Sequence, residues 1–157
     1  MERQGSGGVW ALGLLLLLVA PHLDSLPAAA RSPSPHSGDR AAHAVAYAVA
    51  QHGKPYQWGA EGPGAFDCSG LTWAAWRSAG VQIPRTAAGQ LAALPQVHGR
   101  IRPGDLIVYE TDGPSRRHVA LAISRRQMVE ARGRGIPVRV TRLRPGWLGI
   151  VRPGGRR

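Results

Sequence analysis

At 157 residues, the chain is long enough for one domain with a single modest core and too short for two independent domains. The net charge is +11, and residues 1–30 carry Glu2 and Asp24 against Arg3, so the rest of the chain carries +12. Such a charge attracts polyanions such as wall polymers or anionic lipid. The arginines are scattered, however, and no aromatic-basic platform or DNA-binding motif accompanies them, which argues against nucleic-acid binding.

The first 30 residues have the pattern of a signal peptide, with Arg3 near the start, an apolar run over residues 9–20 and three alanines at 28–30. The apolar run is shorter than the roughly 20 residues that a membrane-spanning helix needs, and Pro21 closes it. We therefore expect an exported protein whose signal peptide is removed. An uncleaved membrane anchor is the alternative.

Composition divides the remaining chain into three parts. Residues 31–38 are rich in Ser and Pro and predict a flexible leader, residues 39–153 predict the folded domain, and residues 154–157 form a basic tail.

Three helices are expected in the first half of the domain. Asp39 is a candidate N-cap for a helix running to about His52, with a core-facing stripe at positions 42, 45, 46 and 49. A second helix is expected to start at or just before Cys68 and to end near Ala79, and a third to cover residues 86–94.

After Gly104 the pattern changes to short apolar runs separated by turn residues. The predicted strands are residues 105–109, 118–123, 127–131, 138–141 and 147–151. Helices followed by strands predict the α+β class with an antiparallel sheet.

Cys68 is the only cysteine, so no disulfide within the chain accounts for it. A free cysteine is often a small buried apolar residue. Cys68, however, follows the candidate helix cap Asp67 and would lie in the first helical turn, where unpaired N–H groups and the helix dipole favour a thiolate. Gly70 would let substrate or neighbouring backbone approach this turn closely. The position therefore favours a reactive thiol.

A cysteine nucleophile needs a base and a group that orients that base. Five of the six histidines lie in the signal region, the leader, the first helix or a loop: His22, His36, His43, His52 and His98. His118 opens a predicted strand, where its ring would face out at one end of the sheet. The residues alone leave a catalytic and a structural role open for His118.

The chain resembles the NlpC/P60 cysteine peptidases in a series of blocks that follow the family's order and span nearly all of the predicted domain. The blocks are Gly53 to Gly59, Phe66 to Leu71, Ile83 to Arg85, Gln90, Arg102 to Leu106, His118 to Ile123, and Glu130 with Ala131. The resemblance implies a small papain-like fold in which the nucleophile Cys68 starts a helix packed on an antiparallel sheet, and His118 on that sheet is the base.

The third catalytic residue is where this chain departs from the commonest family pattern, which has a second histidine twelve residues after the first. Glu130 occupies that position here, and a carboxylate can also accept a hydrogen bond from the imidazole and fix its tautomer. A three-residue loop centred on Ser124 would place the two residues opposite each other, whereas a two-residue turn at Arg125 and Arg126 would put Glu130 on the wrong face.

The resemblance also implies roles for residues around the nucleophile. The Tyr56 hydroxyl would donate to the oxyanion alongside the backbone N–H of Cys68, with packing on Trp58 as the alternative. Tyr56, Asp67 and Ser69 align with residues that hold the free amino end of a stem peptide in some relatives, and for Asp67 this competes with helix capping.

Two further pairs have a structural and a functional interpretation. Trp73 and Trp76 on the second helix are expected to pack in the core rather than to form a binding platform. Arg116 and Arg117, next to His118, are either solvated loop residues or determinants that favour an acidic stem peptide.

The implied function is secreted cysteine endopeptidase acting on peptidoglycan stem peptides at the cell wall, at the bond from γ-D-glutamate to the diamino acid. An inactive wall-binding module and a secreted antibacterial effector, amidase or acyltransferase on the same fold are the alternatives. No metal ion or other cofactor is expected because Cys68 has no neighbouring ligand at metal-binding spacing. The expected partners are stem peptides and anionic wall polymers, with no nucleic acid, and we expect a monomer.

Overall fold

A computed structural model describes residues 36–112 and 117–155 of the chain. The predicted signal peptide, most of the predicted leader, Arg116 and the last two residues of the predicted tail lie outside the described residues. None of the helices in the described ranges is both long enough and apolar enough to cross a membrane.

Helix α1 (Ser37–Ala50) begins three residues earlier than the sequence indicates. Its N-cap is His36, and Asp39 lies inside the first turn, where its carboxylate accepts a hydrogen bond from the His36 backbone N–H at 3.2 Å. The predicted stripe is correct only at Val45, which packs against the core, because Ala44 and Ala48 are the fully buried residues while Val49 is 36% exposed. Small alanines allow α1 to lie close to the next helix, which outweighs the burial of a larger valine.

Helices α2 (Cys68–Ser78) and α3 (Ala87–Ala93) confirm the predicted second and third helices. Both are capped by the preceding side chain: Asp67 accepts from Gly70 N–H, and Thr86 accepts from Gly89 N–H. Trp76 of α2 is buried in the core and donates its indole N–H to the Gly104 carbonyl at 3.2 Å, as core packing requires.

Five strands form one antiparallel sheet, and all five lie close to their predicted positions. They are β1 (Leu106–Glu110), β2 (Arg117–Ala122), β3 (Gln127–Glu130), β4 (Arg139–Arg142) and β5 (Trp147–Val151). The strand order is β4-β3-β2-β1-β5, so β2, which carries His118, is the central strand. Helices followed by an antiparallel sheet confirm the α+β class.

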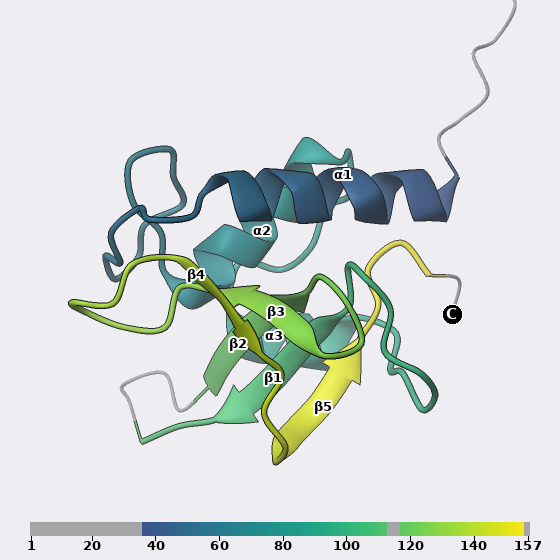
Figure 1. Ribbon diagram of the computed structural model, residues 1–157. Helices are drawn as coiled ribbons and strands as arrows, with labels where there is room; N and C mark the ends of the chain where they lie inside the picture. Colours follow the sequence, from purple (N-terminus) through teal and green to yellow (C-terminus); the bar gives the residue numbers. More distant parts are fainter. Residues whose placement is uncertain (1–35, 113–116, 156–157) are drawn as a thin grey trace, which may run out of the picture. The chain divides into compact units, whose positions relative to one another are not determined.

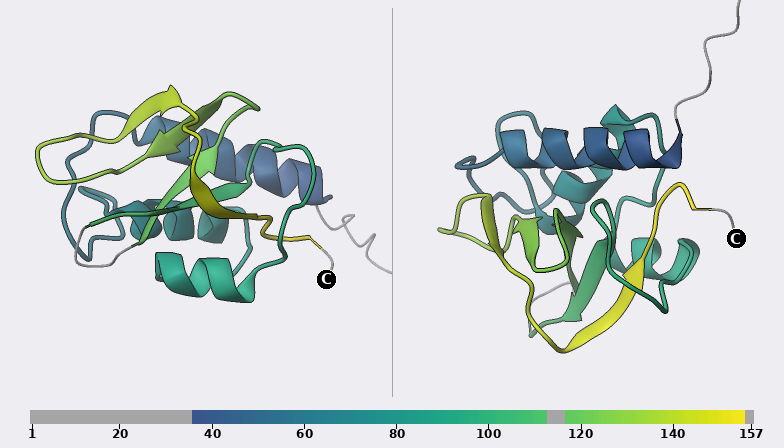
Figure 2. Two further views of the ribbon diagram at one scale, coloured as in Figure 1. Left: turned by 90° about the horizontal axis from the view of Figure 1, so that it is seen from below. Right: turned by 45° about the vertical axis from the view of Figure 1, so that its right-hand side comes forward.

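Successive side chains along each strand point to opposite faces of the sheet, and both faces are apolar. Leu106, Val119 and Leu121 belong to the large core that includes residues of all three helices, and α1 and α2 lie together on that side of the sheet (Figure 1 and Figure 2). Ile107 and Ala120 point to a smaller apolar cluster on the opposite face. The sheet is therefore covered on both faces, and function is expected at the ends of its strands.

Candidate active site

Cys68 is the first residue of α2 and is 8% exposed. The Asp67 side chain accepts from the Gly70 N–H at 2.6 Å and so fixes the first turn of the helix. A Cβ atom on Gly70 would collide with the carbonyl oxygen of Ala60, so the close approach predicted at this glycine is made by neighbouring backbone. The turn that holds the thiol is thereby packed against the 59–61 segment.

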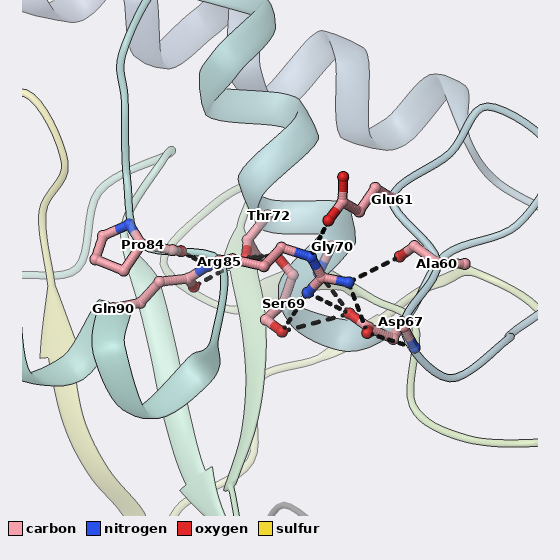
Figure 3. Close-up of polar contacts among 10 residues, drawn as sticks. Ala60, Glu61, Asp67, Ser69, Gly70, Thr72, Pro84, Arg85 and Gln90 are labelled. Carbon is pink, nitrogen blue, oxygen red and sulfur yellow. Dashed lines mark hydrogen bonds and ion pairs between the residues drawn. The ribbon is translucent and has the colours of Figure 1, made fainter.

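Asp67 is also the centre of an ion-pair network behind the nucleophile (Figure 3). Its two carboxylate oxygens accept from the Arg85 guanidinium at 3.1 and 2.9 Å, and one also accepts from Gly59 N–H at 2.9 Å. Arg85 further donates to Ser69 Oγ at 3.0 Å and to Glu61 at 2.7 Å. The carboxylate of Asp67 is therefore occupied by partners within the protein.

His118 and Glu130 meet across the central strands. His118 Nε2 lies 2.9 Å from Glu130 Oε2, and the two residues are 5% and 0% exposed. This contact leaves Nδ1 of His118 for the thiol of Cys68. The other described histidines are exposed at their own sites, so His118 alone among the described residues has the surroundings of a catalytic histidine.

The electrostatics of this pair follow from its contacts. Burial alone would lower the pKa of His118, but hydrogen bonds with Cys68 and Glu130 outweigh it and raise that pKa above the usual 6.5. Burial would raise the pKa of Glu130, but hydrogen bonds from His118 and Arg144 lower it to about 2. Glu130 is therefore a carboxylate at neutral pH and favours the protonated form of His118.

The β2–β3 hairpin reaches this geometry by neither of the two predicted loops. Leu121 pairs with Val129 and Ala122 with Met128, so the loop has three residues but is centred on Arg125. Continuing this register places Glu130 opposite Ala120, diagonal to His118 but on the same face. The Ser124 hydroxyl accepts from the backbone N–H groups of residues 126 and 127 at 3.2 and 3.0 Å, which fixes a loop that has neither Gly nor Asn.

Two residues that the sequence did not single out hold the pair in place. Arg144 binds Glu130 with two hydrogen bonds, from Nη1 to Oε1 at 3.1 Å and from Nη2 to Oε2 at 2.8 Å. Its guanidinium lies over the Tyr109 ring, and that ring stacks at 6.2 Å on His118. Arg139 adds a longer contact to Glu130 at 3.4 Å.

Cys68 and His118 both line a cleft of about 690 Å³. Tyr56 lines the same cleft; burial, with the nearby Cys68 and Asp67, raises its pKa, so its hydroxyl stays protonated and can donate a hydrogen bond. A second cleft of about 500 Å³ lies on the other side of Cys68 and is lined by Trp58, Ser69 and Arg85 among others. The thiol is thus reached from two adjoining clefts, and Trp58, which is 59% exposed, borders both.

No group of three or more histidine, cysteine or carboxylate side chains suited to a metal ion occurs in the part of the chain that the structure describes. The groups that meet at this site are a thiol, an imidazole and a carboxylate, an arrangement suited to nucleophilic attack by sulfur.

Comparison with known proteins places this geometry in a family. The model of the NlpC/P60 family matches residues 53–148. Among curated proteins, the chain is 36% identical over 93 residues to the probable endopeptidase p60 of Listeria monocytogenes and 37% identical over 113 residues to a probable endopeptidase of Mycobacterium bovis. These matches cover 59% and 69% of this chain but only 19% and 27% of the two relatives.

Solved structures give the same result. The peptidoglycan hydrolase RipB of Mycobacterium tuberculosis matches with a TM-score of 0.65 and 31% identity over 78% of this chain and 68% of its own. The P60 domain of the antigen MAP1204 from M. avium subspecies paratuberculosis matches with a TM-score of 0.65 and 30% identity over 74% of this chain and 96% of its own. The α+β fold is therefore the papain-like fold of these proteins, and the chain belongs to the NlpC/P60 family.

Proposed function

We propose that this protein is a cysteine endopeptidase that hydrolyses peptidoglycan stem peptides at the bond from γ-D-glutamate to the diamino acid. The observation that carries the proposal is the 2.9 Å contact between the buried, ionised Glu130 and Nε2 of His118, which lines the same cleft as Cys68. An imidazole held in this way by a carboxylate can take the proton of a thiol. The endopeptidase and peptidoglycan hydrolase relatives support the choice of substrate.

The reaction proceeds through a thioester. Cys68 gives its proton to Nδ1 of His118, and the thiolate attacks the carbonyl carbon of the scissile amide. His118 then returns the proton to the leaving amine as the C–N bond breaks. A water molecule, deprotonated by His118, attacks the thioester and releases the γ-carboxyl product and the free thiol.

Residues around the nucleophile would stabilise the intermediate and hold the substrate. The backbone N–H of Cys68 and the hydroxyl of Tyr56 would donate to the oxyanion, since the first N–H groups of a helix have no intrahelical partner. Ser69 and Asp67 line the second cleft and would hold the amino end of the stem peptide there. Arg85 donates to both Asp67 and Ser69, so binding of the amino end there would have to displace or share these contacts.

Export to the cell wall, as a monomer, is part of the same proposal. The signal-peptide pattern of residues 1–30 supports it, and the +12 charge of the remaining chain would favour anionic wall polymers.

Digestion of purified muropeptides, followed by mass spectrometry of the products, tests the activity and identifies the bond. Cys68→Ala removes one sulfur atom and should abolish hydrolysis while leaving the unfolding midpoint nearly unchanged. Residual activity above a few per cent of the parent would show that another residue attacks. Alkylation of Cys68 no faster than that of a free thiol would indicate an inactive binding module instead.

A further inference from the structure

The cleft that contains Cys68 and His118 carries an excess of positive charge on one side. Arginines contributed by β2, the β3–β4 loop and the β4–β5 connection line it: Arg117, Arg132, Arg134 and Arg144. Glu110 is the one acidic residue among the described lining residues, and it pairs with Arg117 at 3.3 Å. Arg144 forms an ion pair with the buried Glu130. Arg132 and Arg134 have no carboxylate within ion-pair distance in the described ranges.

The loop that carries these two arginines is anchored at both ends. It follows directly on Glu130 and Ala131, which are fully buried. A tight turn is closed within it by the Ile136 N–H, which donates to the Gly133 carbonyl at 3.0 Å. At its far end, Val138 exchanges two backbone hydrogen bonds of 2.8 Å with residues 53 and 54. The backbone that presents the two guanidinium groups is therefore held in place before any ligand binds.

The second cleft, which shares Cys68 with the first, differs in charge. Its Arg85 is bound by both Asp67 and Glu61, and Arg117, which lines both clefts, pairs with Glu110. A substrate lying across Cys68 would thus meet a balanced surface on the α2 side and a cationic surface on the side of the β3–β4 loop.

From this asymmetry we infer that Arg132 and Arg134 form a subsite for a carboxylate of the substrate near the scissile bond. The inference rests on the proposed function and adds to it a substrate class, stem peptides whose α-carboxyl groups are free acids rather than carboxamides. A guanidinium can bind a carboxylate through two parallel hydrogen bonds and a net charge, whereas a carboxamide offers one acceptor and no charge.

Two synthetic peptides that differ only in this group test the subsite: L-Ala-γ-D-Glu-diaminopimelate with free α-carboxylates, and the same peptide with carboxamides. The parent protein should cleave the acid form with a kcat/KM about ten-fold or more above that of the amide. Arg132→Gln combined with Arg134→Gln should bring this ratio close to one, mainly by weakening cleavage of the acid form.

The matched control is Arg125→Gln combined with Arg126→Gln, which removes the same charge from two exposed residues of the β2–β3 loop. This control should keep the parent's ratio, because those side chains line a different surface depression. If it loses the ratio as the first variant does, net charge rather than a subsite sets the preference, and the inference is wrong.

Binding of both peptides to the Cys68→Ala protein, measured by calorimetry, separates the inference from the proposed function. If the parent cleaves neither peptide, the proposed function fails, whereas preferential binding of the acid form would still support the subsite. Equal binding of the two peptides would overturn the subsite even if both are cleaved.

Discussion

The Glu130 carboxylate is buried and takes hydrogen bonds or ion pairs from His118, Arg144 and Arg139. If it orients His118 and stabilises the imidazolium, Glu130→Ala should lower kcat/KM by roughly ten- to a thousand-fold, or about 1.4 to 4 kcal/mol. Glu130→Gln should lower kcat/KM less than Glu130→Ala does if orientation of His118 is the main effect. It should lower kcat/KM nearly as much if the negative charge is the main effect. Steady-state kinetics on a purified muropeptide gives the comparison.

Controls for this prediction are the acidic residues before His118. Glu110→Ala and Asp112→Ala should stay within about two-fold of the parent; a larger loss for either of them than for Glu130→Ala would reassign the third residue. Glu130→His restores the commoner family residue but leaves Arg144 without its counter-charge. It should therefore recover activity better when combined with Arg144→Gln than alone.

Arg144 has an effect on His118 opposite in sign to that of Glu130. In a thiolate–imidazolium site, activity falls at high pH as the imidazolium loses its proton. Glu130→Gln removes a negative charge beside His118, so the alkaline limb of the kcat/KM profile should move to lower pH. Arg144→Gln removes a positive charge, so the same limb should move to higher pH.

The direction of this shift identifies the role of Arg144. If Arg144 served only to keep Glu130 in position, its loss would act like the loss of Glu130 and move the limb downwards, contrary to our expectation. Arg139→Gln is the matched control, because its longer 3.4 Å contact to Glu130 should give a smaller shift in the same direction as Arg144→Gln.

The sequence identified Glu130 but not Arg144 for a physical reason. Glu130 stands at a spacing from His118 that the family resemblance supplies. The contact to Arg144 joins β3 to the connection between β4 and β5, and no local pattern in the sequence predicts which of the many arginines will reach a buried carboxylate.

At the scale of elements, the predicted strands are close to the observed ones and His118 and Glu130 share a face, but the two residues are diagonal rather than directly opposite. The hairpin loop lacks the Gly or Asn that would specify its type, and neither predicted turn formed. The Ser124 hydroxyl, which caps two backbone N–H groups, is the local signal that could have indicated the loop. On α1, the predicted buried face is shifted: Val45 packs against the core, but Ala44 and Ala48 are fully buried and Val49 is exposed.

The first turn of α2 gives a prediction for stability. Gly70→Ala places a Cβ atom against the Ala60 carbonyl, so the helix start or the 59–61 segment must move. We expect a loss of roughly 1–3 kcal/mol in the free energy of unfolding, typical of overpacking, together with reduced kcat/KM because Cys68 lies in the same turn. Urea denaturation measures the first effect.

Gly64→Ala is the control for that experiment, because a Cβ atom there meets no heavy atom within 4 Å. If the two variants have equal urea midpoints, the 59–61 segment adjusts to the added Cβ atom without a loss of stability. In that case the segment does not position the nucleophile.

At the scale of the whole molecule, the net charge predicts how hydrolysis depends on salt concentration. A strongly cationic protein meets a polyanionic wall through screened Coulomb attraction, so hydrolysis of whole wall should fall markedly between about 0.05 and 0.5 M salt. Short soluble muropeptides should show a weaker dependence. Equal salt sensitivity with both substrates would remove electrostatic targeting as an explanation for the arginine content.

The single cysteine has a consequence for oxidation. A cysteine that serves as a nucleophile, as we propose for Cys68, is also prone to oxidation to a sulfenic acid, which other proteins commonly rescue by forming a disulfide with a second, resolving cysteine. These 157 residues contain no such partner for Cys68. Under the proposed mechanism, reactivation after oxidation would depend on a thiol other than those in these residues, and further oxidation to the sulfinic acid would abolish the proposed activity.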